Sequence, residues 1–308
     1  MAKPPRRLVG LLVAALVFAA GIGLLHAGVY GWTLFVLFPV ILGGLSSWVF
    51  RPATGARAAG IGALTASASA CSLLLLGLEG AICILMSLPL VLPLGALGGW
   101  LVHKAQSSPR AARGVTMLLL LPLATLTWDT NAQPRVFAVR TEITVAASPE
   151  QVWKHVVSFS PLPEPHEWFF RAGLAYPQRA RIEGSGPGAV RYCEFSTGPF
   201  VEPIEVWDEP RLLRFRVTEN PAPMHEWSPY GDILPKHLHG YLVSRQGEFR
   251  LTRLENGHTR LQGTTWYQHG LWPAEYWRWW SDAIIHRIHM RVLNHVRTLA
   301  EEESKRSW

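Results

Sequence analysis

Acidic and histidine side chains near the C-terminal end are the residues of this sequence best suited to chemistry. Asp282, His286 and His289 follow one another at spacings of four and three, which places them on one face of a helix. Such a face can bind a metal ion or form a carboxylate–histidine pair. The spacing differs from the helical H-E-x-x-H pattern of zinc enzymes, and further ligands would have to come from distant sequence. We therefore expect no metal site and no cofactor, and we interpret these histidines as a solvated or interfacial face.

Other catalytic signatures are scarce. His237 and His239 flank a leucine but offer only two metal ligands. The sequence contains no G-x-S-x-G elbow, no phosphate-binding loop and no dinucleotide fingerprint. Cys193 is the only cysteine outside the apolar runs, so no disulfide framework can form in the C-terminal half. An acid–base pair of Glu194 with His269, or with Tyr192, is the enzymatic arrangement that remains open, and it requires these side chains to meet.

The C-terminal half, residues 132–308, contains the segments that would position these groups. Apolar and polar residues alternate from Val139 to Val145, which predicts a strand with one buried face. The Ser148-Pro149-Glu150-Gln151 sequence is typical of a capping box and predicts a helix to about Phe159. Strand-like runs separated by turn residues follow, at residues 180–183, 189–197, 200–207, 212–219, 241–254 and 259–269.

A hairpin and a long helix are predicted at the end of the chain. Asn256-Gly257, between the last two runs, is a strong hairpin signal. The helix extends from about Pro273 to Glu303. Its apolar positions recur at three and four residues and predict a stripe that faces a sheet: Trp277, Ser281, Ile284, Ile288, Val292, Val296 and Leu299.

This half resembles the START and polyketide cyclase/dehydrase superfamily, also called SRPBCC, over about residues 136–303. The resemblance rests on residues 143–153, with their A-S-P-E-Q-V-W helix start, on residues 188–192 and 204–210, and on the long terminal helix. It implies the helix-grip fold, in which a curved antiparallel sheet wraps around the last helix and leaves an apolar cavity between them. Members of the superfamily bind lipids, sterols, polyketides or other hydrophobic molecules, and a minority are enzymes.

Residues facing the implied cavity would bind such a ligand by burying apolar area, at about 25 cal/mol per Å². Strand polarity alone leaves open which alternate set faces inward, so Trp266 and Gln268 compete with Tyr267 and His269. The predicted ligand-binding residues are Tyr192, Glu194, Trp227, His239, Tyr241, Trp266, His269, Trp277, Ile284 and Ile288.

Residues 220–239 form a long loop rich in Pro, Gly and large apolar side chains, among them Trp227 and Tyr230. Loops of this length inside a compact domain are usually functional. Either the loop is a lid over the cavity or a surface that touches the bilayer, or it is a packed loop without a gating role. The tryptophans between residues 266 and 280 likewise either fill the core or lie at the level of the lipid headgroups.

Residues 1–131 are predicted to form a transmembrane region. No Asp, Glu, Lys or Arg lies between Leu8 and Phe50, and this run is twice as long as one helix needs to cross about 30 Å of hydrocarbon. Residues 26–31 provide the break within it. We predict five spans, at about residues 8–25, 32–50, 58–78, 81–102 and 114–128, with four spans as the alternative. Small residues four apart predict close helix packing: Gly62, Ala66 and Ala70 on one helix, and Gly95 and Gly99 on the next.

Charge placement predicts the topology. The membrane region contains eight Lys or Arg residues, and with five spans all eight lie on one side, as the positive-inside rule requires. The C-terminal domain of an inner (plasma) membrane protein would then be periplasmic or extracellular, whereas four spans would return it to the cytoplasm. A signal peptide over residues 1–27 is a further alternative that leaves this side unchanged. Basic and acidic residues nearly balance in the C-terminal half, so we expect no nucleic-acid partner.

The sequence thus predicts an α-helical membrane region joined to an α+β helix-grip domain. The predicted function is membrane-anchored binding or transfer of a lipid or other hydrophobic small molecule. A cyclase- or dehydratase-type enzyme that acts on such a molecule, and a membrane assembly or scaffold protein, are the two alternatives. The residues indicate no particular protein partner.

Overall fold

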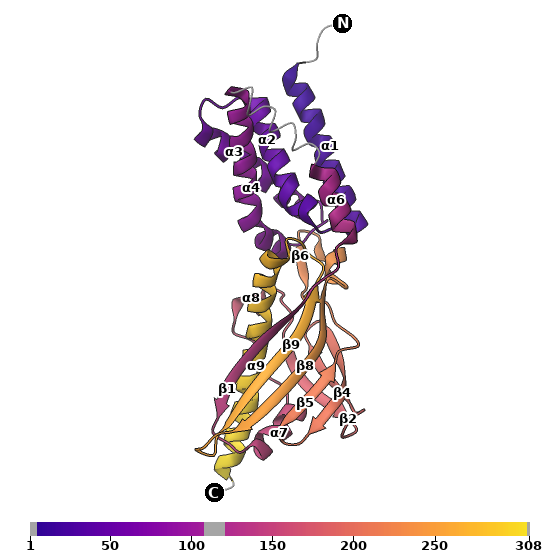
Figure 1. Ribbon diagram of the computed structural model, residues 1–308, viewed down its shortest axis with the longest axis vertical. Coiled ribbons are helices and arrows are strands. Elements are labelled where there is room, and N and C mark those ends of the chain that lie inside the picture. Colours follow the sequence, from indigo (N-terminus) through magenta and orange to yellow (C-terminus); the bar gives the residue numbers. More distant parts are fainter. Residues whose placement is uncertain (1–4, 108–120, 307–308) are drawn as a thin grey trace. The chain divides into compact units, whose positions relative to one another are not determined.

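The computed structural model describes residues 5–107 and 121–306, and the chain divides into two compact units (Figure 1). The first unit consists of Met1–Gln133, Glu226–His237 and Leu271–Glu275. The second unit consists of Pro134–His225, Leu238–Gly270 and Tyr276–Trp308. Two short segments from the C-terminal half therefore belong with the N-terminal helices.

The first unit is mainly helical. Its helices are α1 (Arg6–Ala27), the π-helical turn η1 (Thr33–Leu37) continued by α2 (Phe38–Phe50), α3 (Gly55–Leu75), α4 (Ala81–Ser107) and α6 (Leu121–Asn131). Among the described residues, four helices are long and apolar enough to cross a membrane, where the sequence predicted about five spans. The predicted fifth span, residues 114–128, lies partly outside the described residues, and its described part belongs to α6.

The predicted break between the first two spans is confirmed. Helix α1 ends at Ala27, and Gly28 follows it with φ 76°, the left-handed conformation that glycine adopts without a steric penalty. The backbone N–H of Gly28 donates to the carbonyls of Leu24 and Leu25, which satisfies acceptors left free at the helix end.

Small residues allow α2, α3 and α4 to approach closely. A Cβ atom placed on Gly95 would overlap the Ala66 side chain and the Gly62 backbone, and one on Gly99 would overlap the carbonyl of Ala58. The two small-residue stripes predicted from the sequence therefore lie against each other. Backbone approach of this kind is what holds helices together where lipid removes the hydrophobic driving force.

The second unit contains a seven-stranded antiparallel sheet in the order β1-β9-β8-β5-β4-β3-β2, and the long helix α9 lies along the sheet (Figure 1). Its strands are β1 (Val136–Val145), β2 (Pro177–Glu183), β3 (Val190–Phe195), β4 (Gly198–Asp208), β5 (Leu212–Arg216), β8 (Leu242–Arg253) and β9 (Thr259–His269). The helices are α7 (Pro149–Val157), α8 (Trp168–Arg171) and α9 (Ala274–Arg306). Short elements fill residues 226–238, namely β6 (Glu226–Ser228), β7 (Gly231–Ile233) and the 3-10 turn η3 (Lys236–Leu238).

The capping box and the hairpin are confirmed. At the start of α7, the Gln151 N–H donates to Ser148 Oγ over 3.4 Å, and the Ser148 N–H donates to Gln151 Oε1 over 3.0 Å. Gly257 has φ 79° in the turn between β8 and β9, and the Leu254 N–H donates to the carbonyl of His258 over 2.8 Å. Local sequence therefore determines both where α7 begins and how β8 and β9 pair in the last hairpin.

The core of the second unit lies between the sheet and α9. Fully buried apolar side chains come from β1, α7, β5, β9 and α9: Val145, Val152, Val156, Leu213, Leu261, Leu293 and Val296. The predicted stripe on α9 is broader than expected, because Ile285, Leu293 and Ala300 are buried beside it. A sheet that curves around a helix contacts more than one narrow line of side chains.

Candidate functional site

A cavity of about 130 Å³ lies within the second unit, between the sheet and α9. Its walls come from β3, β4, β5, β8, β9, α9 and the Asn220–Pro223 segment. Most of the lining is apolar, and its large apolar side chains include Phe195, Phe200, Phe215, Phe249, Leu242, Ile284, Ile285, Ile288 and Val292. Polar side chains, among them Arg191, Glu202 and His289, lie between these apolar ones, and a mainly apolar lining with placed polar groups is typical of sites that bind small molecules.

Arg191 and Glu202 are the charged pair of this lining. They are direct partners on β3 and β4, and Arg191 Nη1 donates to Glu202 Oε2. Arg191 is 1% exposed and Glu202 is 6% exposed, so the pair is removed from water. Burial raises the pKa of Glu202, while the attraction of the Arg191 guanidinium acts in the opposite direction.

The surroundings of Arg191 fix its side chain. Arg191 Nε donates to the carbonyl of Val157 over 3.1 Å. Its guanidinium carbon lies 5.5 to 5.6 Å from the ring centroids of Phe159, Phe215 and Phe249, within the range of cation–π attraction. A planar cation held by three rings and a carbonyl has little freedom to turn, so its remaining N–H groups have a fixed direction.

One amino group of this guanidinium has no oxygen acceptor among the described residues. Arg191 Nη2 is buried and has no hydrogen-bond partner among the described residues, although the thiol of Cys193, a weak acceptor, interacts with the same guanidinium. Burial raises the pKa of that thiol to about 12, which keeps it neutral. Thr264 Oγ1, also in the cavity lining, is a second buried polar atom for which the described part of the chain offers no hydrogen-bond partner. An unsatisfied buried donor costs about 1–3 kcal/mol, so a ligand oxygen at this point would be stabilising.

His289 and Glu248 are the other ionisable groups of the lining. The imidazole nitrogens of His289 lie 2.7 Å from Thr265 Oγ1 and 3.1 Å from Thr141 Oγ1. Burial, with a smaller contribution from His286, lowers the pKa of His289 to about 4, so the ring is neutral at physiological pH. Glu248 accepts hydrogen bonds from Arg214 Nη2 over 2.9 Å and from Arg214 Nε over 3.1 Å.

The structure places two of the predicted ligand-binding residues, Ile284 and Ile288, in the cavity lining. Tyr192 and Glu194 alternate with the lining residues of β3 and lie on its other face, where Glu194 accepts from Arg179 Nε over 2.5 Å. The lining does not include the others, which are Trp227, His239, Tyr241, Trp266, His269 and Trp277. Trp227 belongs to the first unit, and His269 stacks on Phe137 with ring centroids 5.3 Å apart.

The histidine face predicted on the last helix hydrogen-bonds to strand side chains. Asp282 accepts from Tyr267 Oη over 2.5 Å and from Arg278 Nε over 3.1 Å. His286 Nδ1 lies 2.8 Å from Thr141 Oγ1. These contacts attach the middle of α9 to β1 and β9.

Sequence reasoning missed the charged pair of the cavity. On β3, one alternate set contains Arg191, Cys193 and Phe195, and the other contains Tyr192 and Glu194. Each set includes a charge and an aromatic ring, so polarity does not distinguish the inner face from the outer. The signal that could have found the pair is the cross-strand match of Arg191 with Glu202, which becomes visible only once the register of β3 and β4 is known.

Comparison with known proteins identifies the second unit. Residues 136–266 match the sequence profile of a family described as polyketide cyclase / dehydrase and lipid transport. No curated protein matches the sequence.

Solved structures with a similar arrangement cover about half of the chain. A protein from Nitrosospira multiformis is 18% identical and covers 55% of this chain and 99% of its own, with a TM-score of 0.34. The Zhui aromatase/cyclase from Streptomyces sp. R1128 is 17% identical, with coverages of 55% and 96% and a TM-score of 0.34. A truncated norcoclaurine synthase from Thalictrum flavum is 12% identical, with coverages of 55% and 96% and a TM-score of 0.35. The described part of the chain also contains four helices apolar enough to span a membrane. From the profile match and the observed sheet and helix, residues 136–266 form a polyketide cyclase / dehydrase and lipid transport domain of the SRPBCC type.

Proposed function

We propose that the protein is a membrane-anchored binding module that holds a hydrophobic molecule with an acceptor oxygen in the cavity of its second unit. The observation that carries this proposal is the combination of an apolar lining with Arg191 Nη2, a buried cationic donor without a hydrogen-bond partner among the described residues. A carboxylate, phosphate or carbonyl oxygen would accept from Nη2, while the rest of the molecule lies against the phenylalanine rings.

The cavity volume limits the enclosed part of the ligand. Ligand pockets usually measure about 300–1,000 Å³, and an apolar cavity of about 150 Å³ holds a molecule the size of benzene. At about 130 Å³, this cavity suits a single ring or a short stretch of acyl chain. A longer ligand requires movement of the wall, and the Asn220–Pro223 segment is a stretch of the wall that lies outside the strands and helices.

The proposed anchoring rests on the four apolar helices and on the positions of the basic residues. Lys3 precedes α1, and Arg6 and Arg7 lie in its first turn. Arg51 directly follows α2, Arg57 lies in the first turn of α3, and Lys104 lies near the end of α4. The positive-inside rule places these positions in the cytoplasm, and an additional span after α4 would carry the second unit to the periplasmic or extracellular side.

Native mass spectrometry of the full chain, released from detergent, tests the binding proposal. The expected result is a co-purified lipid or other hydrophobic molecule that contains a carboxylate, phosphate or carbonyl group. The variant Arg191→Met/Glu202→Leu replaces both charged side chains with apolar ones of similar size. The fraction of this variant that carries the molecule is expected to fall at least tenfold. The control Arg179→Gln, on the surface of β2, is expected to retain it.

Two results would overturn the proposal. The first is a full chain that carries no hydrophobic molecule and does not enhance the fluorescence of anilinonaphthalene sulfonate. The second is equal retention by the wild-type protein and the double variant. If the extracted molecule is chemically altered on incubation with the protein, the cyclase or dehydratase alternative takes the place of simple binding.

Reporter fusions test the orientation separately. Alkaline phosphatase joined after Asn131 is expected to be active, and green fluorescent protein at the same position is expected to be dark. The opposite pattern would place the second unit in the cytoplasm and leave the binding proposal intact.

A further inference from the structure

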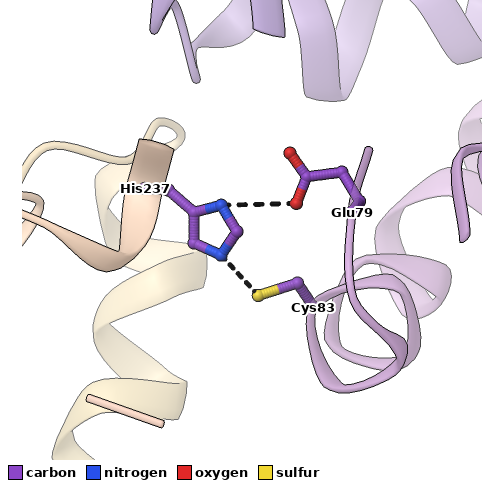
Figure 2. Close-up of side chains that lie close together, drawn as sticks. All are labelled: Glu79, Cys83 and His237. Carbon is purple, nitrogen blue, oxygen red and sulfur yellow. Dashed lines mark hydrogen bonds and ion pairs between the residues drawn. The ribbon is translucent and has the colours of Figure 1, made fainter. Parts of the chain in front are cut away.

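A second group of ionisable side chains lies in the first unit, apart from the residues of the cavity. Glu79 is in the short connection between α3 and α4, Cys83 is in the first turn of α4, and His237 is in η3. Figure 2 shows the imidazole of His237 facing both other side chains. Its Nε2 lies 2.8 Å from Cys83 Sγ, and its Nδ1 lies 3.3 Å from Glu79 Oε2. One ligand atom from each residue lies within 4.8 Å of the other two.

Neighbouring groups hold these side chains in place. Tyr30 Oη donates to Glu79 Oε1 over 2.8 Å, so the other carboxylate oxygen is the one that faces His237. The imidazole packs against the Tyr30 ring with centroids 5.1 Å apart. Glu226 accepts from the backbone N–H of Cys83 over 2.9 Å and thereby caps the start of α4. The approach of Glu226 requires Gly80, because a Cβ at that position would overlap the carboxylate.

The side chains of this group are buried. Glu79 is 5% exposed, His237 is 7% exposed and Glu226 is 0% exposed. Neither carboxyl group has a lysine or arginine partner among the residues that the structure describes, and Lys236 instead donates to the carbonyl of His26. Buried acids without a counter-ion are costly, and they are normally paired or bound to a metal. His237 Nδ1 adds a buried polar atom that has no hydrogen bond of good geometry among the described residues.

The order of contacts, thiol to imidazole to carboxylate, also occurs in enzymes with a cysteine nucleophile. The negatively charged surroundings of Cys83 argue against a cysteine nucleophile. A reactive cysteine needs an electropositive environment that stabilises the thiolate, and helix N-termini often provide it. Here the Glu226 carboxylate already accepts from the N–H groups of Ile82 and Cys83 at the start of α4, and Glu79 adds a second acid. These acids oppose a free thiolate and favour a cation bound to it.

We propose that Glu79, Cys83 and His237 bind a divalent metal ion of the zinc class. Thiolate, imidazole and carboxylate are the three ligand types of protein zinc sites, and the thiolate excludes Mg²⁺ and Ca²⁺ as preferred ions. Ligand atoms on a tetrahedral zinc ion lie about 3.5 Å apart, so Cys83 Sγ and His237 Nε2 would separate slightly and Glu79 would move inward by about 1 Å. Three protein ligands leave one coordination position for water or another group.

Such an ion would join two segments that are distant in the sequence. His237 follows Cys83 by 154 residues, and the ion would attach the residue 226–237 segment to the start of α4. The site is independent of the proposed ligand cavity, since none of its three residues lines that cavity.

Metal analysis of the full chain tests the proposal. The protein is purified in detergent with an affinity tag that contains no histidine, stripped with a chelator, and titrated with Zn²⁺. The expected result is about one zinc per chain by inductively coupled plasma mass spectrometry. Co²⁺ in place of Zn²⁺ is expected to give a thiolate-to-cobalt charge-transfer band, which reports directly on Cys83.

Matched variants separate the site from adventitious binding. Cys83→Ser and His237→Gln are each expected to weaken zinc binding at least 100-fold and to abolish the cobalt band. Cys71→Ser, at an exposed cysteine of α3, and His239→Gln, at an exposed histidine two residues from His237, are expected to bind as the wild type does. Glu79→Gln, which keeps the hydrogen bond from Tyr30, is expected to weaken binding about 10- to 100-fold without loss of folded protein.

The proposal is overturned if the stripped wild-type chain takes up no Zn²⁺ at micromolar concentration. It is equally overturned if Cys83→Ser and His237→Gln, shown to be folded by circular dichroism and gel filtration, bind zinc as tightly as the two controls.

Discussion

Arg191 and Glu202 face each other directly across β3 and β4, and their charged groups pair inside the domain instead of at its surface. A buried ion pair gives little net stability compared with an apolar pair of similar size, but the loss of one partner leaves an uncompensated charge. The pair is therefore better explained by what it can bind than by what it contributes to folding, and this distinction can be measured.

Removal of a single charge from the pair is predicted to destabilise the second unit strongly. Arg191→Met leaves the Glu202 carboxylate buried without a partner, and the expected loss is about 3–5 kcal/mol of unfolding free energy. Arg191→Met/Glu202→Leu is expected to recover most of that loss. Denaturant unfolding of the full chain, followed by near-ultraviolet circular dichroism, provides the comparison. A double variant as unstable as the single one would show that the pair itself stabilises the fold.

Filling the cavity is predicted to displace its ligand. Ile288→Trp adds a ring to the lining, and the expected result is at least a tenfold loss of the co-purified hydrophobic molecule, with about 1–3 kcal/mol of destabilisation from overpacking. Ala283→Trp, at an exposed position on the same helix, is the control and is expected to retain the ligand. Native mass spectrometry measures both. Equal occupancy of the two variants would place the ligand elsewhere.

The neutral imidazole of His289 predicts a loss of stability in acid. Its pKa is lowered to about 4 in the folded protein, from 6.5 in the unfolded chain. Between these values the unfolded chain binds a proton that the folded protein does not, so the free energy of unfolding falls as the pH decreases from 6.5 to 4. Protonation of His289 is expected to account for a decrease of roughly 3 kcal/mol in the free energy of unfolding over this pH range.

Unfolding measured at several pH values, with wild type compared to His289→Gln, isolates this contribution. Glutamine keeps hydrogen-bonding groups near Thr265 and Thr141 but does not titrate in this range. The difference in unfolding free energy between the two proteins is expected to be constant above pH 6.5 and to shift in favour of the variant as the pH decreases from 6.5 to 4. A difference that does not vary with pH would mean that His289 titrates normally in the folded state.

Helix packing in the first unit is predicted to depend on Gly95. Gly95→Leu would place a side chain where Ala66 and the Gly62 backbone now lie, and the expected result is separation of α3 and α4 with loss of monodisperse protein. Gly60→Leu on α3 is the matched control, since a Cβ there meets no atom within 4 Å. Fluorescence-detected gel filtration in detergent after a heating series reports the melting of each variant. Similar melting temperatures would assign the packing to other contacts.

Much of the fold could be predicted because it depends on local rules. The Ser148 capping box, the Asn256-Gly257 turn and the glycine after α1 each impose a conformation within a few residues. The small-residue stripes on α3 and α4 were equally visible, since helical spacing puts such residues on one face. Long apolar runs likewise indicated the four apolar helices of the described residues, although the sequence predicted a fifth span, and turn residues indicated the strand-like runs along the chain.

The cavity lining and the group of Glu79, Cys83 and His237 could not be predicted with the same rules. The inner face of β3 depends on strand register, which the polarity of Tyr192, Glu194 and Arg191 does not determine. His237 and Cys83 are 154 residues apart, and no periodicity relates a loop histidine to a cysteine within an apolar helix. Such groups form only when distant segments fold together.

The pairing of the first strand with the last has a consequence for how the protein is made. β1 contacts only β9 in the sheet, with Val145 opposite Thr259, so residues 146–258 must be synthesised before β1 finds its partner. During that interval a ten-residue strand has backbone groups without a partner strand. Protection of the nascent chain by a chaperone, or fast closure once β9 and α9 arrive, then determines how much of the protein escapes aggregation.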